Sequence, residues 1–179
     1  ELSLIDILYF DYGSDLQDVV YPNAEDVEGY TFMEWSQSIP LTMPASNLKI
    51  NAIYAINHYT ITFVTNDGNA IDDQEWDFGS SISELPIPSK TGFVFADWYL
   101  NEELTEHLAY PFTITEDICL YADWGTEGLL YTDIAGGKLS VTKGTANNAV
   151  IIIPKWMNGK QVTTIVESAF YGYAELTSV

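Results

Sequence analysis

The clearest pattern along the chain is an alternation of residue types between Tyr59 and Val64. Tyr59, Ile61 and Phe63 alternate with Thr60, Thr62 and Val64, and this period of two is typical of a half-buried β-strand. Asn66-Asp67-Gly68 follows and supplies residues that tolerate a positive φ. The pattern therefore predicts a hairpin whose second arm returns through residues 71–78.

Two further segments begin with a glycine followed by alternating aromatic residues. Gly29 and Gly92 each precede such a segment, where glycine lets the backbone turn sharply into a sheet. We expect the aromatic residues of both segments to lie in the core: Phe32, Trp35, Phe95 and Trp98.

Helical signals are few. Ser14 with Gln17, and Ser81 with Glu84, have the spacing of a helix capping box. Because Pro22 and Pro86 follow closely, each segment is predicted to form a helix of at most about two turns.

The chain repeats itself. DYGSDLQ at 11–17 is echoed by DFGSSIS at 77–83, and GYTFMEW at 29–35 by GFVFADW at 92–98. The copies also end alike, with Ala52 aligned on Ala122 and Tyr54 on Trp124. We infer two copies of one module, of which the first lacks a clear opening strand.

The pattern changes after Gly125. A hairpin about Gly136-Gly137 is predicted, then a buried strand at 149–154, then a strand and a short helix within 161–179. The predicted division is a first module at 1–56, a second at 57–125 and a third section at 126–179. The fold is expected to be mostly β.

Charge supports a boundary near Gly125 and narrows the function. The 179 residues carry 26 acidic side chains, six lysines and no arginine, for a net charge of −20. All of that net charge lies in residues 1–125, since residues 126–179 hold four acids and four lysines. Nucleic acid is therefore not an expected partner, and anionic membrane surfaces are disfavoured. The charge fits a solvated surface or a partner with a basic patch.

Apolar runs are short, and neither a membrane span nor a signal peptide is expected in the sequence. The one cysteine, Cys119, stands in the apolar run ICLYADW and is expected to be buried.

No set of residues forms a recognisable catalytic constellation. His58 and His107 are the only histidines, and both are expected at the surface. Neighbouring carboxylates occur at Asp72-Asp73, Glu102-Glu103 and Glu116-Asp117, but nothing places a pair across a cleft. We therefore assign no catalytic residue and expect no enzyme.

Two turns were considered as binding sites. Residues 66–73 offer oxygen ligands of the kind that calcium prefers, but lack the loop spacing and final glutamate of a calcium-binding hand, so a plain hairpin turn is favoured. Gly136-Gly137-Lys138 lacks the spacing of a phosphate-binding loop. No metal or cofactor is expected.

The aromatic residues leave an alternative open. Tyr30, Phe32 and Trp35, with Phe93, Phe95 and Trp98, would stack on sugars if they were exposed, as in a carbohydrate-binding module. Their repeat-matched positions favour the core instead.

The second copy resembles the Listeria–Bacteroides repeat, the type of the B repeat of internalin B. The resemblance covers residues 58–124 and rests on Pro86 and Pro88, the run from Gly92 to Tyr99 and the closing Leu120–Trp124. Residues 150–179 resemble the first unit of BspA-type leucine-rich repeats, with Ile-Pro, Gly-Lys-x-Val-Thr-x-Ile, Ala-Phe-x-Gly and Leu-Thr-Ser-Val. A single repeat of that kind cannot bury its own face, so the natural protein is expected to continue with more repeats.

These resemblances imply an α+β, mostly β fold of tandem β-grasp-like modules, followed by a β-rich cap and the first unit of a leucine-rich repeat solenoid. They imply a non-enzymatic modular protein that is extracellular, secreted or on the bacterial cell surface. It would act as a spacer or stalk and as an adhesion or protein-interaction module. The expected partner is a host or neighbouring-cell surface protein or glycan, without membrane insertion by this chain.

Overall fold

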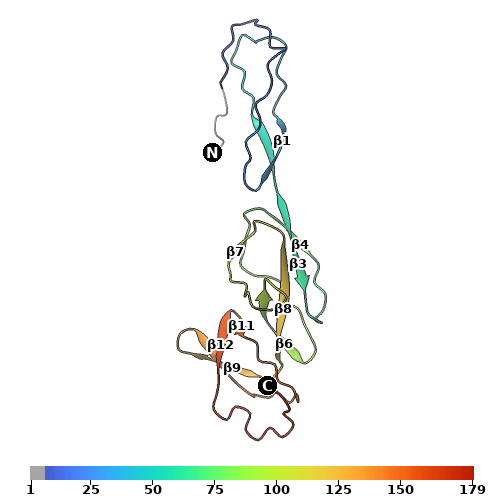
Figure 1. The fold of residues 1–179 in the computed structure, drawn as a ribbon, viewed down its shortest axis with the longest axis vertical. Helices are drawn as coiled ribbons and strands as arrows, with labels where there is room; N and C mark the ends of the chain where they lie inside the picture. Colours follow the sequence, from blue (N-terminus) through green and yellow to red (C-terminus); the bar gives the residue numbers. More distant parts are fainter. Residues whose placement is uncertain (1–6) are drawn as a thin grey trace. The chain divides into compact units, whose positions relative to one another are not determined.

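The computed structural model describes residues 7–179, and this part of the chain forms twelve β-strands and no helix (Figure 1). The chain divides into two compact units, residues 1–58 and 59–179. We call them unit 1 and unit 2 and describe each by itself. The expected α+β class is therefore wrong for residues 7–179, which are all-β.

The two short helices expected near Ser14 and Ser81 are absent because both segments pair across their modules. Ser81–Ile82 forms β5, which pairs antiparallel with β7 (Phe112–Thr113). In unit 1, Asp15 makes a single bridge to Thr42. A helix of one or two turns forms few hydrogen bonds, and these do not offset its nucleation cost. Pairing with a distant segment of the same chain is therefore favoured.

Unit 1 is built on one antiparallel strand pair. β1 (Tyr30–Trp35) pairs with β2 (Ala52–Ile56). Phe32 lies opposite Tyr54 and Trp35 opposite Ala52, with an irregularity in the register between Phe32 and Glu34. The rest of the described part of this unit consists of turns and irregular segments.

The first half of unit 2 contains a four-stranded sheet in the order β4-β3-β8-β6. The strands are β3 (His58–Val64), β4 (Gln74–Asp77), β6 (Phe93–Tyr99) and β8 (Ile118–Thr126). β3 runs parallel to β8, and β6 runs antiparallel to it. The predicted hairpin is confirmed, since β4 follows β3 in the chain and lies beside it.

The second half of unit 2 forms another four-stranded sheet, in the order β11-β12-β10-β9. Its strands are β9 (Leu130–Ile134), β10 (Lys138–Thr142), β11 (Trp156–Met157) and β12 (Lys160–Ile165). β9 and β10 pair antiparallel about the turn at Gly136-Gly137, which confirms the predicted hairpin. A strand within 161–179 is likewise confirmed by β12.

Two predictions for this section are wrong. Residues 149–154 form no strand: Val150 makes only one bridge, to Ser178, and Val150 and Ile152 are exposed while Ile151 is buried. Residues 166–176 form a series of turns in place of a helix. Since only alternate side chains of 150–152 face inward, the apolar run is not evidence for a fully buried strand. No leucine-rich repeat solenoid is formed within residues 7–179.

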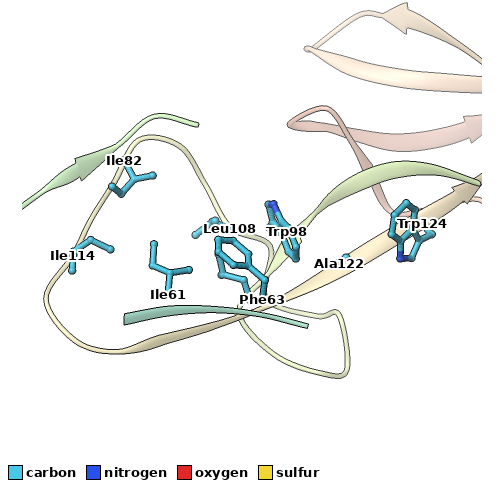
Figure 2. Close-up of a cluster of buried hydrophobic side chains, with 9 residues drawn as sticks. Ile61, Phe63, Ile82, Trp98, Leu108, Ile114, Ala122 and Trp124 are labelled. Atoms are coloured by element: carbon cyan, nitrogen blue, oxygen red, sulfur yellow. The ribbon is translucent and has the colours of Figure 1, made fainter. Parts of the chain in front are cut away.

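The main core lies within the four-stranded sheet of β3, β4, β6 and β8 and the segments that cover it (Figure 2). Its buried members come from several parts of the module: Ile61, Phe63, Ile82, Trp98, Leu108, Ile114, Leu120, Ala122 and Trp124. A second, smaller cluster joins Ala96 of β6 to Leu139 and Met157 of the C-terminal sheet. The two sheets of unit 2 therefore pack together.

The inferred repeat is visible in the strand pairing. Trp98 lies opposite Ala122 and Phe95 opposite Trp124, as Trp35 and Phe32 lie opposite Ala52 and Tyr54. Both pairs have the register irregularity at the same position, after Phe32 and after Phe95. The alignment of Ala52 on Ala122 is thus confirmed.

Ring geometry repeats as well. The centroids of Phe32 and Trp35 are 5.5 Å apart at 58°, and those of Phe95 and Trp98 are 5.2 Å apart at 56°. Gly29 and Gly92 have φ values of 75° and 79° and accept hydrogen bonds from Asn57 and Glu127. The two copies therefore share backbone and side-chain geometry as well as sequence.

Candidate functional site

The sequence-predicted carboxylate pairs do not converge. Asp72-Asp73, Glu102-Glu103 and Glu116-Asp117 are all exposed and lie in separate connecting segments. Asp117 accepts a hydrogen bond from the Thr60 amide at 2.8 Å, which fixes the start of β3 against β8. This contact indicates a structural role for Asp117.

The turn considered for calcium holds a lysine. Asn66 and Asp67 adopt positive φ, as expected for the turn. The Lys90 ammonium donates to the Asn66 carbonyl at 2.8 Å and lies 3.5 Å from the Asp67 carboxylate. It also lies 5.7 Å from the Trp124 ring. The Asn66-Asp67 part of this turn thus contacts a cation of the chain itself. Among residues 7–179, no three His, Cys, Asp or Glu side chains are gathered as metal ligands.

Cys119 is exposed, and the expectation that it is buried is wrong. It lies on β8 between Ile118 and Leu120, and Leu120 is fully buried. Successive side chains of a strand point to opposite faces, so the neighbour of an inward Leu120 points outward. Because nearly all residues of this run are apolar, the sequence alone did not indicate which of them point outward.

His107 is also placed differently from the expectation of a surface residue. Its side chain is only 13 % exposed, and its Nε2 atom lies 2.9 Å from Oδ2 of Asp97, a residue that is 5 % exposed. The imidazole stacks on Trp156 with ring centroids 4.0 Å apart and an angle of 11°. The Gly159 amide donates to the same Asp97 oxygen at 2.8 Å. We call Asp97, His107, Trp156 and Gly159 the junction cluster.

The junction cluster joins the two sheets of unit 2. Asp97 belongs to β6 and His107 to the following loop, whereas Trp156 belongs to β11 and Gly159 to the turn before β12. A buried carboxylate needs such partners because an uncompensated charge is costly away from water. Asp97 also accepts a hydrogen bond from the Trp98 amide at 3.0 Å. The cluster therefore holds the C-terminal sheet against the module.

A second carboxylate lies opposite the first. Asp123 on β8 pairs in register with Asp97, and its Oδ1 accepts a hydrogen bond from the Trp124 amide at 2.8 Å. Burial and the charge of Asp97 raise the pKa of Asp123. Burial and the charge of Asp123 raise the pKa of Tyr131 to about 12, and that of Tyr99 rises for similar reasons. These tyrosines therefore remain protonated at neutral pH.

This arrangement has structural rather than catalytic features. The histidine contacts a carboxylate and two aromatic rings, those of Trp156 and Tyr99. A catalytic histidine would instead need a nucleophile or a substrate within hydrogen-bond reach. Sequence reasoning missed the cluster because its members are far apart in the chain. The Ala-Asp-Trp triplet at Asp97 and again at Asp123 was the available signal.

The aromatic residues of the second copy pack on one another. Trp98 and Trp124 are 1 % and 5 % exposed, and Phe95 contacts both rings. Trp98 Nε1 donates to the Pro86 carbonyl, and Trp124 Nε1 donates to the Thr65 carbonyl. These contacts indicate that the aromatic residues of the second copy form part of the core. In the first copy Phe32 and Trp35 are half-buried and Tyr30 is exposed.

No helix within residues 7–179 has the length and apolar character needed to cross a membrane.

Residues 59–123 match the family model of the Listeria-Bacteroides repeat domain. The match extends from β3 into β8 and includes the main core apart from Trp124, together with Asp97, His107 and Asp123. Trp156 and Gly159 lie outside it, so the junction cluster joins the repeat to a different section of the chain.

Proteins with similar segments include two from Evansella cellulosilytica and one from Listeria monocytogenes. Two proteins of Evansella cellulosilytica, whose names describe them as membrane proteins, one of them glycine-rich, are 37 % and 34 % identical over 58 % and 64 % of this chain. Internalin H of Listeria monocytogenes is 33 % identical over 44 % of this chain. The aligned regions span 17 %, 14 % and 16 % of these relatives' lengths. The likeness therefore concerns a module of larger proteins.

Proposed function

We propose that this chain is part of a non-enzymatic, modular protein of the bacterial cell surface or exterior, in which residues 1–56 and 57–125 are spacer and adhesion modules. The observation that carries the proposal is the repeated strand pair, with equal registers and ring contacts at Trp35 and Trp98. The family match at residues 59–123 and the membrane-protein and internalin relatives support the same role.

The connection between the copies supports a spacer role. β2 ends at Ile56 and β3 begins at His58, so one residue separates the strands. The Asn57 amide is itself bonded to the Gly29 carbonyl at 2.8 Å. A link this short and this well bonded limits the freedom of a chain between modules.

The proposal includes a leucine-rich repeat region that begins within residues 126–179 and is presented by the modules. Its support is the parallel pairing in this section. Ser140 pairs with Thr164, 24 positions on, and Val150 bridges to Ser178, 28 positions on. Leucine-rich repeats place parallel strands at a period of 20–29 residues.

The spacer role is tested with two spin labels. Cys119 is naturally exposed in unit 2, and Val20→Cys would place a second thiol at a site that is 79 % exposed in unit 1. We expect double electron–electron resonance to give one narrow distribution of the distance between the two spin labels, and we expect added salt to leave it unchanged. A broad distribution would refute the spacer role. Cys119 with Tyr12→Cys is the matched second pair, because Tyr12 is also 79 % exposed.

The adhesion role is tested by binding of the purified chain to host-cell and bacterial surfaces before and after protease treatment of those surfaces. Binding that is lost after protease treatment supports a protein partner. The carbohydrate-binding alternative depends on the first-copy aromatics, of which Tyr30 is 42 % exposed. A glycan array run with and without calcium tests it, and binding that falls on Tyr30→Ala would favour it over a protein partner.

A further inference from the structure

The junction between the two sheets of unit 2 holds two carboxylates close together. Asp97 of β6 and Asp123 of β8 lie opposite each other in register. Asp97 is buried and Asp123 is half-buried, and burial together with the charge of Asp97 raises the pKa of Asp123. Two like charges held this way destabilise the packing around them unless a proton or a cation compensates.

His107 is placed to supply that compensation. Its Nε2 atom lies 2.9 Å from Oδ2 of Asp97, and its side chain is only 13 % exposed. Within residues 7–179 this Nε2 atom is fully covered and makes no well-aligned hydrogen bond, so its contact with Asp97 depends on charge. A charged imidazolium is strongly attracted to a carboxylate at this distance, whereas a neutral imidazole contributes much less.

The C-terminal sheet contacts the other face of the same ring. The indole of Trp156 stacks on the imidazole with ring centroids 4.0 Å apart and an angle of 11°. A cation over an aromatic face is stabilised by the negative potential of that face. Trp156 belongs to β11 and Asp97 to β6. Protonation of His107 therefore strengthens its contacts with both sheets at once.

The hydroxyl groups around the cluster do not change charge in the same pH range. Burial and the charges of the two aspartates raise the pKa of the tyrosines from β6, the following loop and β9: Tyr99, Tyr110 and Tyr131. These tyrosines are therefore uncharged across the range in which histidine titrates.

The charged residues nearest to the cluster in the sequence have other surroundings. Lys160, next to the turn before β12, has its ammonium 2.6 Å from the carboxylate of Asp133. Glu106 and Lys155 are exposed, so solvent and salt screen their charges. The charge of the junction near neutral pH is therefore set by His107 and the two aspartates.

We propose that the junction cluster is a pH-sensitive switch, in which protonation of His107 at mildly acid pH tightens the C-terminal sheet on the repeat and deprotonation loosens it. Histidine is the side chain whose charge changes in this range. Asp123 acts in the same direction, because a carboxylate with a raised pKa contributes stability at low pH that is lost as pH rises through the raised value. The switch goes beyond the proposed function, since it places the junction under the control of pH.

The test is amide hydrogen exchange of the whole 179-residue chain, followed residue by residue by NMR. Rates are measured at about pH 5.5 and about pH 8, on either side of the histidine titration. Each rate is divided by the intrinsic rate at that pH, which removes the pH dependence of exchange itself. Protection of Gly159 and of β10 and β12 is expected to be at least about threefold greater at the lower pH. Protection of β4, at the far edge of the repeat sheet, should change less.

Two histidine variants form a matched pair. His107→Gln keeps a polar side chain that cannot become charged, and it should remove most of the difference between the two pH values. His58→Gln changes the exposed histidine at the start of β3 and should leave the difference intact. Asp123→Asn should increase protection at the higher pH and so reduce the difference.

The proposal is overturned if protection at the junction is the same at both pH values. It is also overturned if His107→Gln keeps the full difference. If that variant does not fold, the unaltered chain still decides the question, because the NMR shift of the Gly159 amide should follow the same titration curve as the ring signals of His107. A Gly159 signal that does not respond while the His107 ring titrates would equally refute the switch.

Discussion

Replacing equivalent tryptophans in the two copies tests how fully each module is closed. Trp98 is 1 % exposed, contacts the rings of Phe63 and Phe95, and donates a hydrogen bond to the Pro86 carbonyl. Trp98→Ala should therefore cost about 3–5 kcal/mol, the usual range for removing a large buried aromatic side chain. Trp35→Ala should cost roughly 1–2 kcal/mol, because its ring is half-buried and less apolar area is lost.

The assay is urea unfolding of the whole chain, followed through resolved amide NMR signals of each unit, so that each variant is measured in its own unit. Trp98→Phe serves as the control, because it keeps most of the apolar volume, and should cost about 1–2 kcal/mol. Equal costs for Trp35→Ala and Trp98→Ala would refute the reasoning. Such a result would mean that the described part of the first copy packs around Trp35 as closely as the second copy packs around Trp98.

Three further results are expected. Gly68→Ala should destabilise unit 2 by about 1–3 kcal/mol in urea unfolding, because a Cβ atom there would lie 2.6 Å from Trp124 Cζ2; Gly79→Ala, with open space but a φ of 79°, should cost only about 1 kcal/mol. Cys119 should react with a thiol reagent in the folded chain as quickly as in urea, and strong protection would show that it is covered. The raised pKa of Asp123 contributes stability at low pH that is lost as pH rises through the raised value. Asp123→Asn should therefore raise the urea midpoint of unit 2 at pH 7 more than at pH 3, and an equal change at both would contradict the shift.

Local pattern was sufficient for the features that depend on neighbouring residues. The alternation at 59–64 predicted β3, and the turn residues Asn66-Asp67-Gly68 and Gly136-Gly137 predicted two hairpins. Repeated letters predicted repeated geometry, because the same residues at the same spacing meet the same steric limits. Gly29 and Gly92 illustrate this, since both adopt a positive φ before an aromatic strand.

Features that depend on distant segments could not be read in the same way. The capping-box spacing at Ser81 favoured a helix locally, but pairing of β5 with β7, some thirty residues on, satisfies that backbone. His107 lies among polar residues in the sequence and was assigned to the surface. Its ring is covered by Trp156, which lies 49 positions further along the chain. The burial of a polar residue depends on which residues pack on it, and the sequence around His107 does not indicate that Trp156 does so.

The two copies show how one strand pair adapts to different surroundings. Ala96, at the register irregularity of β6, is buried against Leu139 and Met157, whereas its equivalent Met33 is 61 % exposed. A small side chain lets the C-terminal sheet approach β6 closely.

The next position follows the same logic. Asp97 lies opposite Asp123, and Asp97 is buried with partners from the C-terminal sheet. Its equivalent Glu34 lies opposite Ile53, and both are exposed. An acidic residue is tolerated at either site. In the second copy the carboxylate of Asp97 is covered and contacts His107 and the Gly159 amide, whereas Glu34 is exposed. Within the described residues 7–58, the first copy therefore shows neither a sheet packed on the equivalent of Ala96 nor a strand that covers the equivalent of Leu120. Since the strand pair keeps its register in both copies, the repeat retains its framework while the packing on its two faces differs between the copies.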